Sequence, residues 1–391
     1  MTKIVDIEDI RKKREKKEIG IPIENINKKE LKRRGHEIGD ILGCDEKGEE
    51  ICVRKGKGNL YVDGDMEKEQ LFDFMRSQIY QNIQRGDSMV IVDLGSRIYK
   101  RELWIYLTIH GYRVDSYNMD CMTESDCFNC LDGLGAENEE QIVMIANDII
   151  DDQKYKFMTY PVETACKALL SAVLLASLTE MEESDRNMLE IATIFRLGVS
   201  GTMLDKILHV MFEDETSSAK QLFAMYSEAE EGIRMEAIQK IGNALAVYEK
   251  RANGSLCDNF RTNRYDMEMP VKEKSVLFIE SGQLPEDKVL FSVFMERLYD
   301  SMLKKAEERQ QDVTVMLLDY PYYGGLCGLE KYMEEGPEKG ICTTLYEDDR
   351  KLDGSGYAPH LVELYSLCDI SVCIKDTEIP LCEIEKCENP V

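Results

Sequence analysis

Short apolar runs alternate with helical patterns along much of the chain. Runs rich in β-branched, aliphatic and aromatic residues, each bounded by Gly, Asp or Pro, predict strands. The predicted strands are 59–62, 89–94, 113–118, 275–280, 313–319, 341–346 and 369–374, and the predicted helices are 66–84, 97–110, 285–309, 328–335 and 358–367. Because several runs are almost wholly apolar, we expect a mostly parallel sheet that is covered on both faces.

The alternation stops between residues 131 and 255, where the pattern predicts roughly four to six helices and no strand. The most apolar helix covers 165–178. This run is shorter than the roughly 20 residues that span a bilayer, so we predict a buried helix. A second helix at 235–251 is amphipathic. We therefore predict a basic arm at 1–40, an α/β domain formed by 41–130 and 256–391, and an inserted all-α domain at 131–255.

The charge is strongly negative and unevenly distributed. The 391 residues include 75 acidic and 49 basic side chains, for a net charge of −26. A surface this acidic repels phosphate backbones, so we do not expect the whole molecule to bind DNA directly. Residues 1–36 hold 12 Lys or Arg and 7 acids. The basic run 11–17 is either a solvated arm or a contact site for anionic lipid, nucleic acid or the acidic remainder of the chain.

Cysteine usage favours a reducing compartment. The 13 cysteines are scattered through apolar segments, and the first 20 residues lack the apolar segment of a signal peptide. We therefore expect reduced thiols in a cytoplasmic protein. Cys121, Cys127 and Cys130 cluster in the sequence, but no second pair of ligands stands nearby, as structural zinc requires. We expect neither a metal site nor a bound cofactor.

Four segments, taken in order, resemble one known family. They are a Lys-Lys-Glu-Leu and Ile-Leu-Gly segment in 28–62, a strand ending at Asp93 followed by Gly-Tyr-Arg-Val, the run VMLLDYPYYGG at 315–325, and LYSLCDISVCIKD at 364–376. Together they resemble the TraG/TraD-like coupling ATPases of conjugative type IV secretion, over about 28–375. The resemblance implies a RecA-like P-loop NTPase sheet with an inserted all-α domain.

The phosphate-binding loop departs from the family pattern. An active loop reads Gly-x-x-x-x-Gly-Lys-Ser/Thr, because the glycines let backbone N–H groups surround phosphate, the Lys neutralises it and the hydroxyl holds Mg²⁺. Under the resemblance the loop begins at Gly64, and Glu69, Gln70 and Leu71 replace the last three motif residues. Lys68 lies two positions too early to take the role of the motif lysine. The resemblance therefore implies a degenerate nucleotide site.

The hydrolysis strand is incomplete as well. Asp319 stands where the family has its magnesium-binding acid, but Tyr320 replaces the acid that activates water. The glutamine that senses γ-phosphate is replaced by Tyr346 or Glu347. Because isolated carboxylates rarely fix Mg²⁺ without phosphate, we expect Asp319 and Asp93 to be loop caps or surface residues.

Three functions are compatible with this pattern. The first is a non-catalytic component of a type IV secretion or conjugation system, which contacts a relaxase or an active coupling ATPase. The second is a divergent ATPase of a conjugation system, and the third is an acidic adaptor protein of a mobile element.

The helical stretch also offers a candidate binding surface. Its acidic residues have few basic neighbours, and we expect Glu228, Glu230 and Glu231 to bind a basic partner. A merely solvated acidic face is the alternative. Any membrane contact is expected to be peripheral. The other acids of this stretch are Glu180, Glu182, Glu183, Asp185, Glu213, Asp214 and Glu215.

Overall fold

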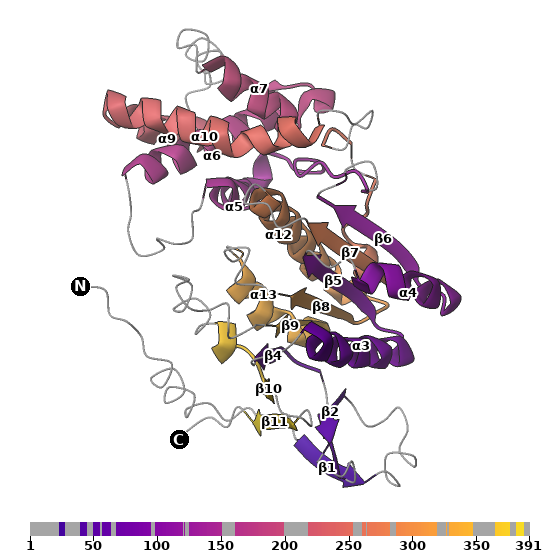
Figure 1. The fold of residues 1–391 in the computed structure, drawn as a ribbon. Coiled ribbons are helices and arrows are strands. Elements are labelled where there is room, and N and C mark those ends of the chain that lie inside the picture. The colour runs from indigo at the N-terminus through magenta and orange to yellow at the C-terminus, as the bar shows by residue number, and fades with distance from the viewer. Residues whose placement is uncertain are drawn as a thin grey trace, which may run out of the picture.

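The main sheet has eight strands in the order β11-β10-β4-β9-β8-β5-β7-β6 (Figure 1). All neighbours are parallel except β10 and β11. Their bounds are β4 Leu60–Asp63, β5 Ser88–Leu94, β6 Arg113–Asn118, β7 Ser275–Ser281, β8 Val313–Leu318, β9 Ile341–Tyr346, β10 Ile370–Lys375 and β11 Leu381–Lys386. The predicted mostly parallel sheet and its seven predicted strands are confirmed.

The computed structural model describes most of the chain between residues 57 and 375, with shorter described segments on either side. The described residues are 23–27, 40–44, 50–54, 57–63, 68–94, 98–119, 121, 125–150, 161–198, 218–252, 260–262, 264–281, 287–318, 326, 328–346, 364–375 and 381–386.

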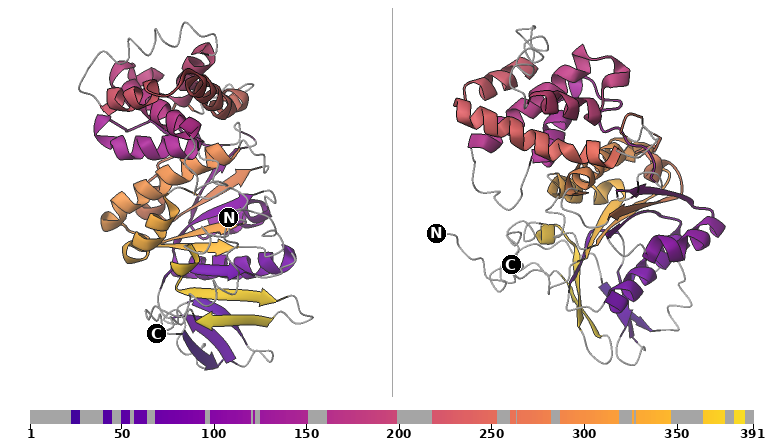
Figure 2. Two further views of the ribbon diagram at one scale, coloured as in Figure 1. Left: turned by 90° about the vertical axis from the view of Figure 1, so that its left-hand side faces the viewer. Right: turned by 45° about the horizontal axis from the view of Figure 1, so that its top comes forward.

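Helices cover both faces of this sheet (Figure 2). Along β5, Met89 and Ile91 face the core beneath α3 Lys68–Arg85 and α4 Ile98–Ile109. The alternate residues Val90 and Val92 face a larger core beneath α12 Asp287–Lys305 and α13 Leu329–Glu335. Strands buried on both faces read as continuous apolar runs, which is why the sequence pattern located them. Short helices α11 Met269–Lys272, η7 Ala306–Glu308 and η9 Pro337–Lys339 complete this part.

A group of helices lies between β6 and β7 in the chain and packs together at one end of the molecule (Figure 1). Its members are η4 Ala136–Asn138, α5 Glu139–Ile150, α6 Pro161–Glu180, η6 Glu183–Asp185, α7 Met188–Gly198, α9 Ser218–Ser227 and α10 Glu231–Ala252. The described residues from 125 to 252 contain no strand, in agreement with the predicted helical stretch. The domain boundaries at 131 and 255 remain a prediction.

Helix α6 forms the core of this group. It packs against α5, α9 and α10, and almost every residue from Ala165 to Leu178 is buried. Among the described residues it is the one helix whose length and composition would allow it to cross a membrane. Its burial among the neighbouring helices agrees with the predicted buried helix.

A second, three-stranded sheet was not predicted as such. Strands β1 Ile23–Asn27, β3 Glu50–Arg54 and β2 Asp40–Cys44 pair antiparallel in that order, at the opposite end of the molecule from the helical group (Figure 1). Strand β1 lies within the predicted basic arm, so that part of the arm is structured. Strand β2 contains the Ile-Leu-Gly of the family-like segment, whereas the Lys-Lys-Glu-Leu of that segment lies outside the described residues.

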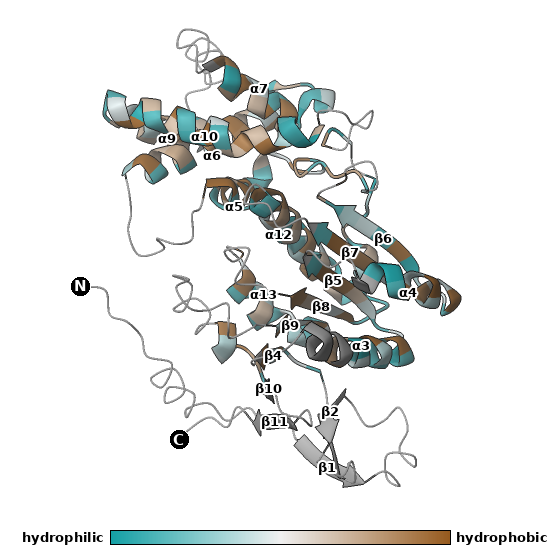
Figure 3. Ribbon diagram, in the orientation of Figure 1, coloured by the Kyte–Doolittle hydropathy of each residue, from teal (hydrophilic) through white to brown (hydrophobic). Residues whose placement is uncertain are grey.

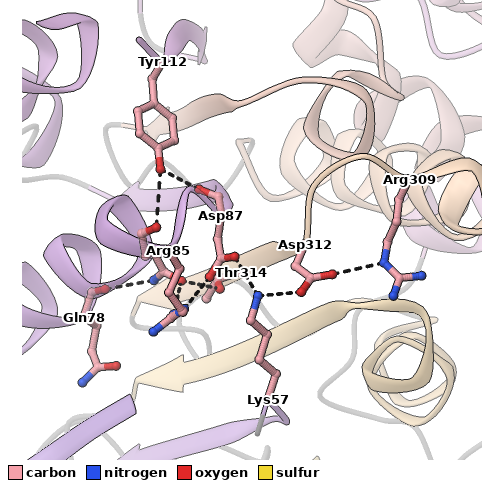
Figure 4. A network of polar contacts seen from close by, with 9 residues as sticks. Lys57, Gln78, Arg85, Asp87, Tyr112, Arg309, Asp312 and Thr314 are labelled. Atoms are coloured by element: carbon pink, nitrogen blue, oxygen red, sulfur yellow. Dashed lines mark hydrogen bonds and ion pairs between the residues drawn. The ribbon is translucent and has the colours of Figure 1, made fainter. Parts of the chain in front are cut away.

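Ion pairs tie together the amino ends of the parallel strands (Figure 4). Lys57, which precedes β4, donates to Asp87 before β5 and to Asp312 before β8, at 2.7 Å each. Arg85 also bonds Asp87 at 2.7 Å, and Arg309 bonds Asp312 at 3.1 Å. Although partial burial acts in the opposite direction, Lys57 and Arg309 together hold the pKa of the Asp312 carboxyl below its usual value. This edge of the sheet is therefore occupied by structural contacts.

Candidate functional site

The carboxyl ends of the central strands meet at the opposite edge of the main sheet. Strand β9 lies between β4 and β8, and Tyr346 at its end pairs in register with Val62 on one side and Leu318 on the other. The chain therefore leaves β4 and β8 at the same edge, one or two residues before the degenerate loop and the hydrolysis motif. Ligands of parallel α/β sheets bind at this edge.

The degenerate loop leads into α3. Lys68, Glu69, Gln70 and Leu71 form the first turn of this helix, while Gly64 lies outside the described residues. The first N–H groups of a helix have no intrahelical partners and favour anions. Under the resemblance, Glu69 and Gln70 stand where the motif has glycine and lysine.

The hydrolysis motif is described only in part. Asp319 and Tyr320 follow β8 directly and lie outside the described residues, as does Glu347. Tyr346 is 1% exposed, and its ring packs edge-on against Phe74 of α3 with the centroids 6.3 Å apart. A phenol buried in an apolar core does not face an open ligand site. Tyr346 therefore serves packing between β9 and α3.

Asp93 does not lie where we expected it. It is 1% exposed near the end of β5, in register with Glu280 of β7, which is 2% exposed. Of the two predicted roles, the surface position is therefore wrong, and the loop cap stays a prediction. The reason is the sheet order, because β5 lies between β8 and β7 and helices cover both of its faces.

A buried ion pair next to Asp93 was missed by the sequence analysis. Lys100 in the first turn of α4 donates to Glu280 at 2.7 Å, and the Ser116 hydroxyl of β6 donates to the same carboxylate oxygen at 2.8 Å. This pair attaches α4 to the ends of β6 and β7. One sequence signal was available, since Glu280 directly follows the apolar run of a predicted buried strand and is its last residue, and a buried carboxylate needs a partner.

A second buried acid lies where the helical group meets the sheet-covering helices. Glu296 of α12 is 3% exposed and accepts a hydrogen bond from the Tyr332 hydroxyl of α13. Burial is the main cause that raises the pKa of Glu296 to about 8, and the neighbouring Asp148 of α5 and Asp300 of α12 contribute, while the Tyr332 hydrogen bond acts in the opposite direction. Nothing in the local sequence around Glu296 indicates this environment.

The predicted partner-binding acids are all on the surface. Glu228 and Glu230 lie between α9 and α10, and Glu231 begins α10, so the chain turn brings the three together. All three are exposed, as are Glu180 and Glu182 at the end of α6. The structure thus provides a compact acidic surface at the α9–α10 junction.

The cysteine cluster is largely internal. Cys127 and Cys130 are buried, Cys121 is half-buried, and burial raises the pKa of the Cys130 thiol to about 12. Within the described ranges, no three His, Cys, Asp or Glu side chains gather closely enough to hold a metal ion.

Comparison with solved structures adds to this geometry. Over 95% of the chain, the structure superposes on 89% of the bacterial conjugative coupling protein TrwBdeltaN70 in its unbound monoclinic form, with a TM-score of 0.60 and 14% identity. The chain has a coupling-protein fold. The plasmid coupling protein TrwB in complex with ADP and Mg²⁺ matches with a TM-score of 0.59 and 14% identity, over 90% of this chain and 80% of that one.

Comparison of the sequence alone identifies no relative of this kind. No family model matches the chain, and no curated protein sequence matches it significantly. The likeness to TrwB is therefore one of fold, found at 14% sequence identity. The solved TrwB complexes include one with ADPNP and one with GDPNP.

Proposed function

We propose that this chain is a non-catalytic component of a type IV secretion or conjugation apparatus that acts through protein contacts. The observation that carries the proposal is the coupling-protein fold combined with a first turn of α3 that holds Glu69, Gln70 and Leu71. In this proposal residues 131–255 are a domain that contacts partners. The protein works in the cytoplasm, and any membrane contact is peripheral.

The chemistry of the loop supports a lost nucleotide site. ATP and Mg²⁺ need a closed ring of N–H donors, one cation and one hydroxyl ligand. With a nucleotide bound at this loop, Glu69 would add a negative charge near the phosphates, and a like-charge contact at 4 Å costs about 1–4 kcal/mol. Tyr320 replaces the acid that would activate water, so a bound nucleotide would still lack its general base.

Calorimetry with ATP and Mg²⁺ tests this part of the proposal. The wild-type chain is expected to bind ATP with a dissociation constant above about 1 mM, which corresponds to a binding free energy smaller in magnitude than about 4 kcal/mol. Gln70→Lys alone is expected to bind no better, because Glu69 and Leu71 remain. The triple change Glu69→Gly, Gln70→Lys, Leu71→Ser supplies the matched comparison. A micromolar dissociation constant for the wild type would refute the non-catalytic role and favour a divergent ATPase.

The acidic surface at the α9–α10 junction is the proposed contact with partners. Glu228, Glu230 and Glu231 would attract a basic protein and accelerate its encounter. A relaxase or an active coupling ATPase of the same genetic element fits this chemistry. Because these charges are exposed, the contact should weaken steeply between about 50 and 200 mM salt, as the screening length falls.

Pull-downs of the relaxase and the active ATPase from the same element test the surface. The variant with Lys at 228, 230 and 231 is expected to lose the partner at low salt. The control carries the same charge reversal at Glu307, Glu308 and Glu334, which are exposed on the α/β part. Retention of the partner by the first variant, or equal loss from both variants, would remove the binding role from this surface.

A further inference from the structure

Helix α4 exposes most of its large apolar side chains. It buries Leu103 and Leu107 against the sheet, but Ile105 is 71% exposed and Ile109 is 76% exposed. Trp104 and Tyr106 are each more than one-third exposed, and Tyr80 of the adjacent α3 joins them. We call the set Tyr80, Trp104, Ile105, Tyr106 and Ile109 the α4 patch.

The rings of the α4 patch are already ordered. The Tyr80 and Tyr106 rings meet edge-on with centroids 5.2 Å apart, and Tyr106 lies 4.1 Å from the His110 ring. The Lys100 ammonium lies 5.9 Å from the centroid of the Trp104 ring. Figure 3 shows the hydrophobic end of α4 at the outer side of the molecule, beyond β6. A binding partner would therefore meet a surface that costs little conformational entropy to order.

The α4 patch is as large as the largest apolar patch of a typical folded monomer. Two isoleucines and three partly exposed aromatic rings present apolar area on the order of 500 Å². The largest patch on a monomer is often functional. Two such patches brought together would bury about 1,000 Å², near the lower limit for a specific interface before any rim residues contribute.

The charges around the α4 patch bear on which molecule can bind there. The chain has a net charge of −26, so two copies repel each other over most of their surfaces. Residues 74–85 of α3 contain no acid, since Glu69 and Asp73 lie nearer its start, and α4 contains only Glu102 beside Lys100 and Arg101. The α4 patch is therefore a place where a second copy can approach with little repulsion.

We propose that the α4 patch is the contact through which two copies of this chain associate about a two-fold axis. An apolar patch is complementary to itself, and two-fold contacts use the same surface on both partners. Ile105 and Ile109 project furthest and form the centre of the contact, with the Trp104 and Tyr106 rings around them. This contact is independent of the nucleotide loop and of the acidic surface at the α9–α10 junction.

The single tryptophan makes the contact directly measurable. Trp104 is the only tryptophan in the sequence, so intrinsic emission reports on α4 alone. Sedimentation equilibrium of the full chain from about 0.1 to 100 µM should show monomer and dimer, a range set by standard interfaces. Trp104 emission should shift to shorter wavelength over the same range. Added salt should strengthen the dimer, because it screens the repulsion between two acidic molecules.

Two double variants separate the possible outcomes. Ile105→Glu with Ile109→Glu should weaken dimerisation at least about tenfold, as expected at an interface centre. Met225→Glu with Met235→Glu is the control, since these residues are 56% and 53% exposed on the helical group. It should leave the dimer unchanged, and circular dichroism should show both variants folded.

Several results would overturn the proposal. A wild-type chain that stays monomeric at the highest concentration has no such contact. Dimerisation that survives the Ile105 and Ile109 changes lies elsewhere on the molecule. Loss of the dimer in the Met225 and Met235 variant would show that two different surfaces meet. A monomer whose Trp104 emission shifts only with phosphatidylcholine vesicles would assign the patch to lipid.

Discussion

Replacing Glu296 with Gln should remove a large part of the pH dependence of stability between about pH 5 and 8. Burial raises the pKa of Glu296 from 4.5 to about 8 in the folded chain, with Asp148 as the next cause. In the unfolded chain this carboxyl ionises near its ordinary value. Folding in this pH window therefore requires the uptake of one proton.

The sign follows from the raised pKa. The contribution of Glu296 to stability is fully present below the unfolded pKa of about 4.5 and is lost as the pH rises through about 8. One proton taken up on folding corresponds to about 1.4 kcal/mol per pH unit. Between pH 5.5 and 7.5 the wild type should therefore lose on the order of 2–3 kcal/mol through this one group.

The amide keeps the geometry while removing the titration. Glu296→Gln retains an oxygen that can accept the Tyr332 hydroxyl bond and is nearly the same size. Urea unfolding at pH 5.5, 6.5 and 7.5 gives the free energy of unfolding of each variant. Glu308→Gln, at a surface position of η7, is the matched control and should follow the wild-type curve.

The test compares how the free energy of unfolding of the wild type and of Glu296→Gln depends on pH. The free energy of unfolding of Glu296→Gln should fall less steeply with pH than that of the wild type, by about 1 kcal/mol per pH unit or more. Relative to the wild type, the variant should therefore be more stable at pH 7.5 than at pH 5.5. Parallel curves for the wild type and Glu296→Gln would show that Glu296 is ionised in the folded chain. The buried contact between α5, α12 and α13 would then hold an ionised Glu296.

Two further changes test other contacts of the fold by urea unfolding. Lys100→Met should cost about 2–4 kcal/mol, because Glu280 would be left buried without its cation. The double change Lys100→Met with Glu280→Gln should recover much of that loss, and failure to recover would mean that the ion pair is not the cause. Gly340→Ala should cost about 1–2 kcal/mol, since φ is +74° and the added methyl would meet the Asp312 and Arg309 side chains. An unchanged stability would show that the turn before β9 relaxes freely.

The amino-acid sequence determined the central strands and the helices that cover them. Residues 313–318 and 341–346 are apolar because helices bury both faces of the sheet, and that burial is readable within each segment. The predicted strand 113–118 matches β6 residue for residue. The chemical content of the degenerate loop is also fixed by sequence, since Gln70 supplies no positive charge in any fold.

Two strands that escaped prediction, β1 and β11, are short and carry Glu between apolar residues. Strand β11 at 381–386 alternates apolar and acidic residues, and it forms by pairing with β10. Strand β1 at 23–27 pairs with β3, which lies more than twenty residues further along the chain. Such strands depend on hydrogen bonds to distant segments, and the periodicity of a single segment does not report those bonds.

The tertiary structure alone decided the environment of the charged residues. Sheet order buries Asp93 beside Glu280, and the start of α4 supplies Lys100 to that carboxylate. Likewise, Glu296 has a raised pKa chiefly because it is buried under α13, and α5 adds the charge of Asp148. Burial and charge pairing arise between elements far apart in the chain, so the sequence specifies these residues without specifying what surrounds them.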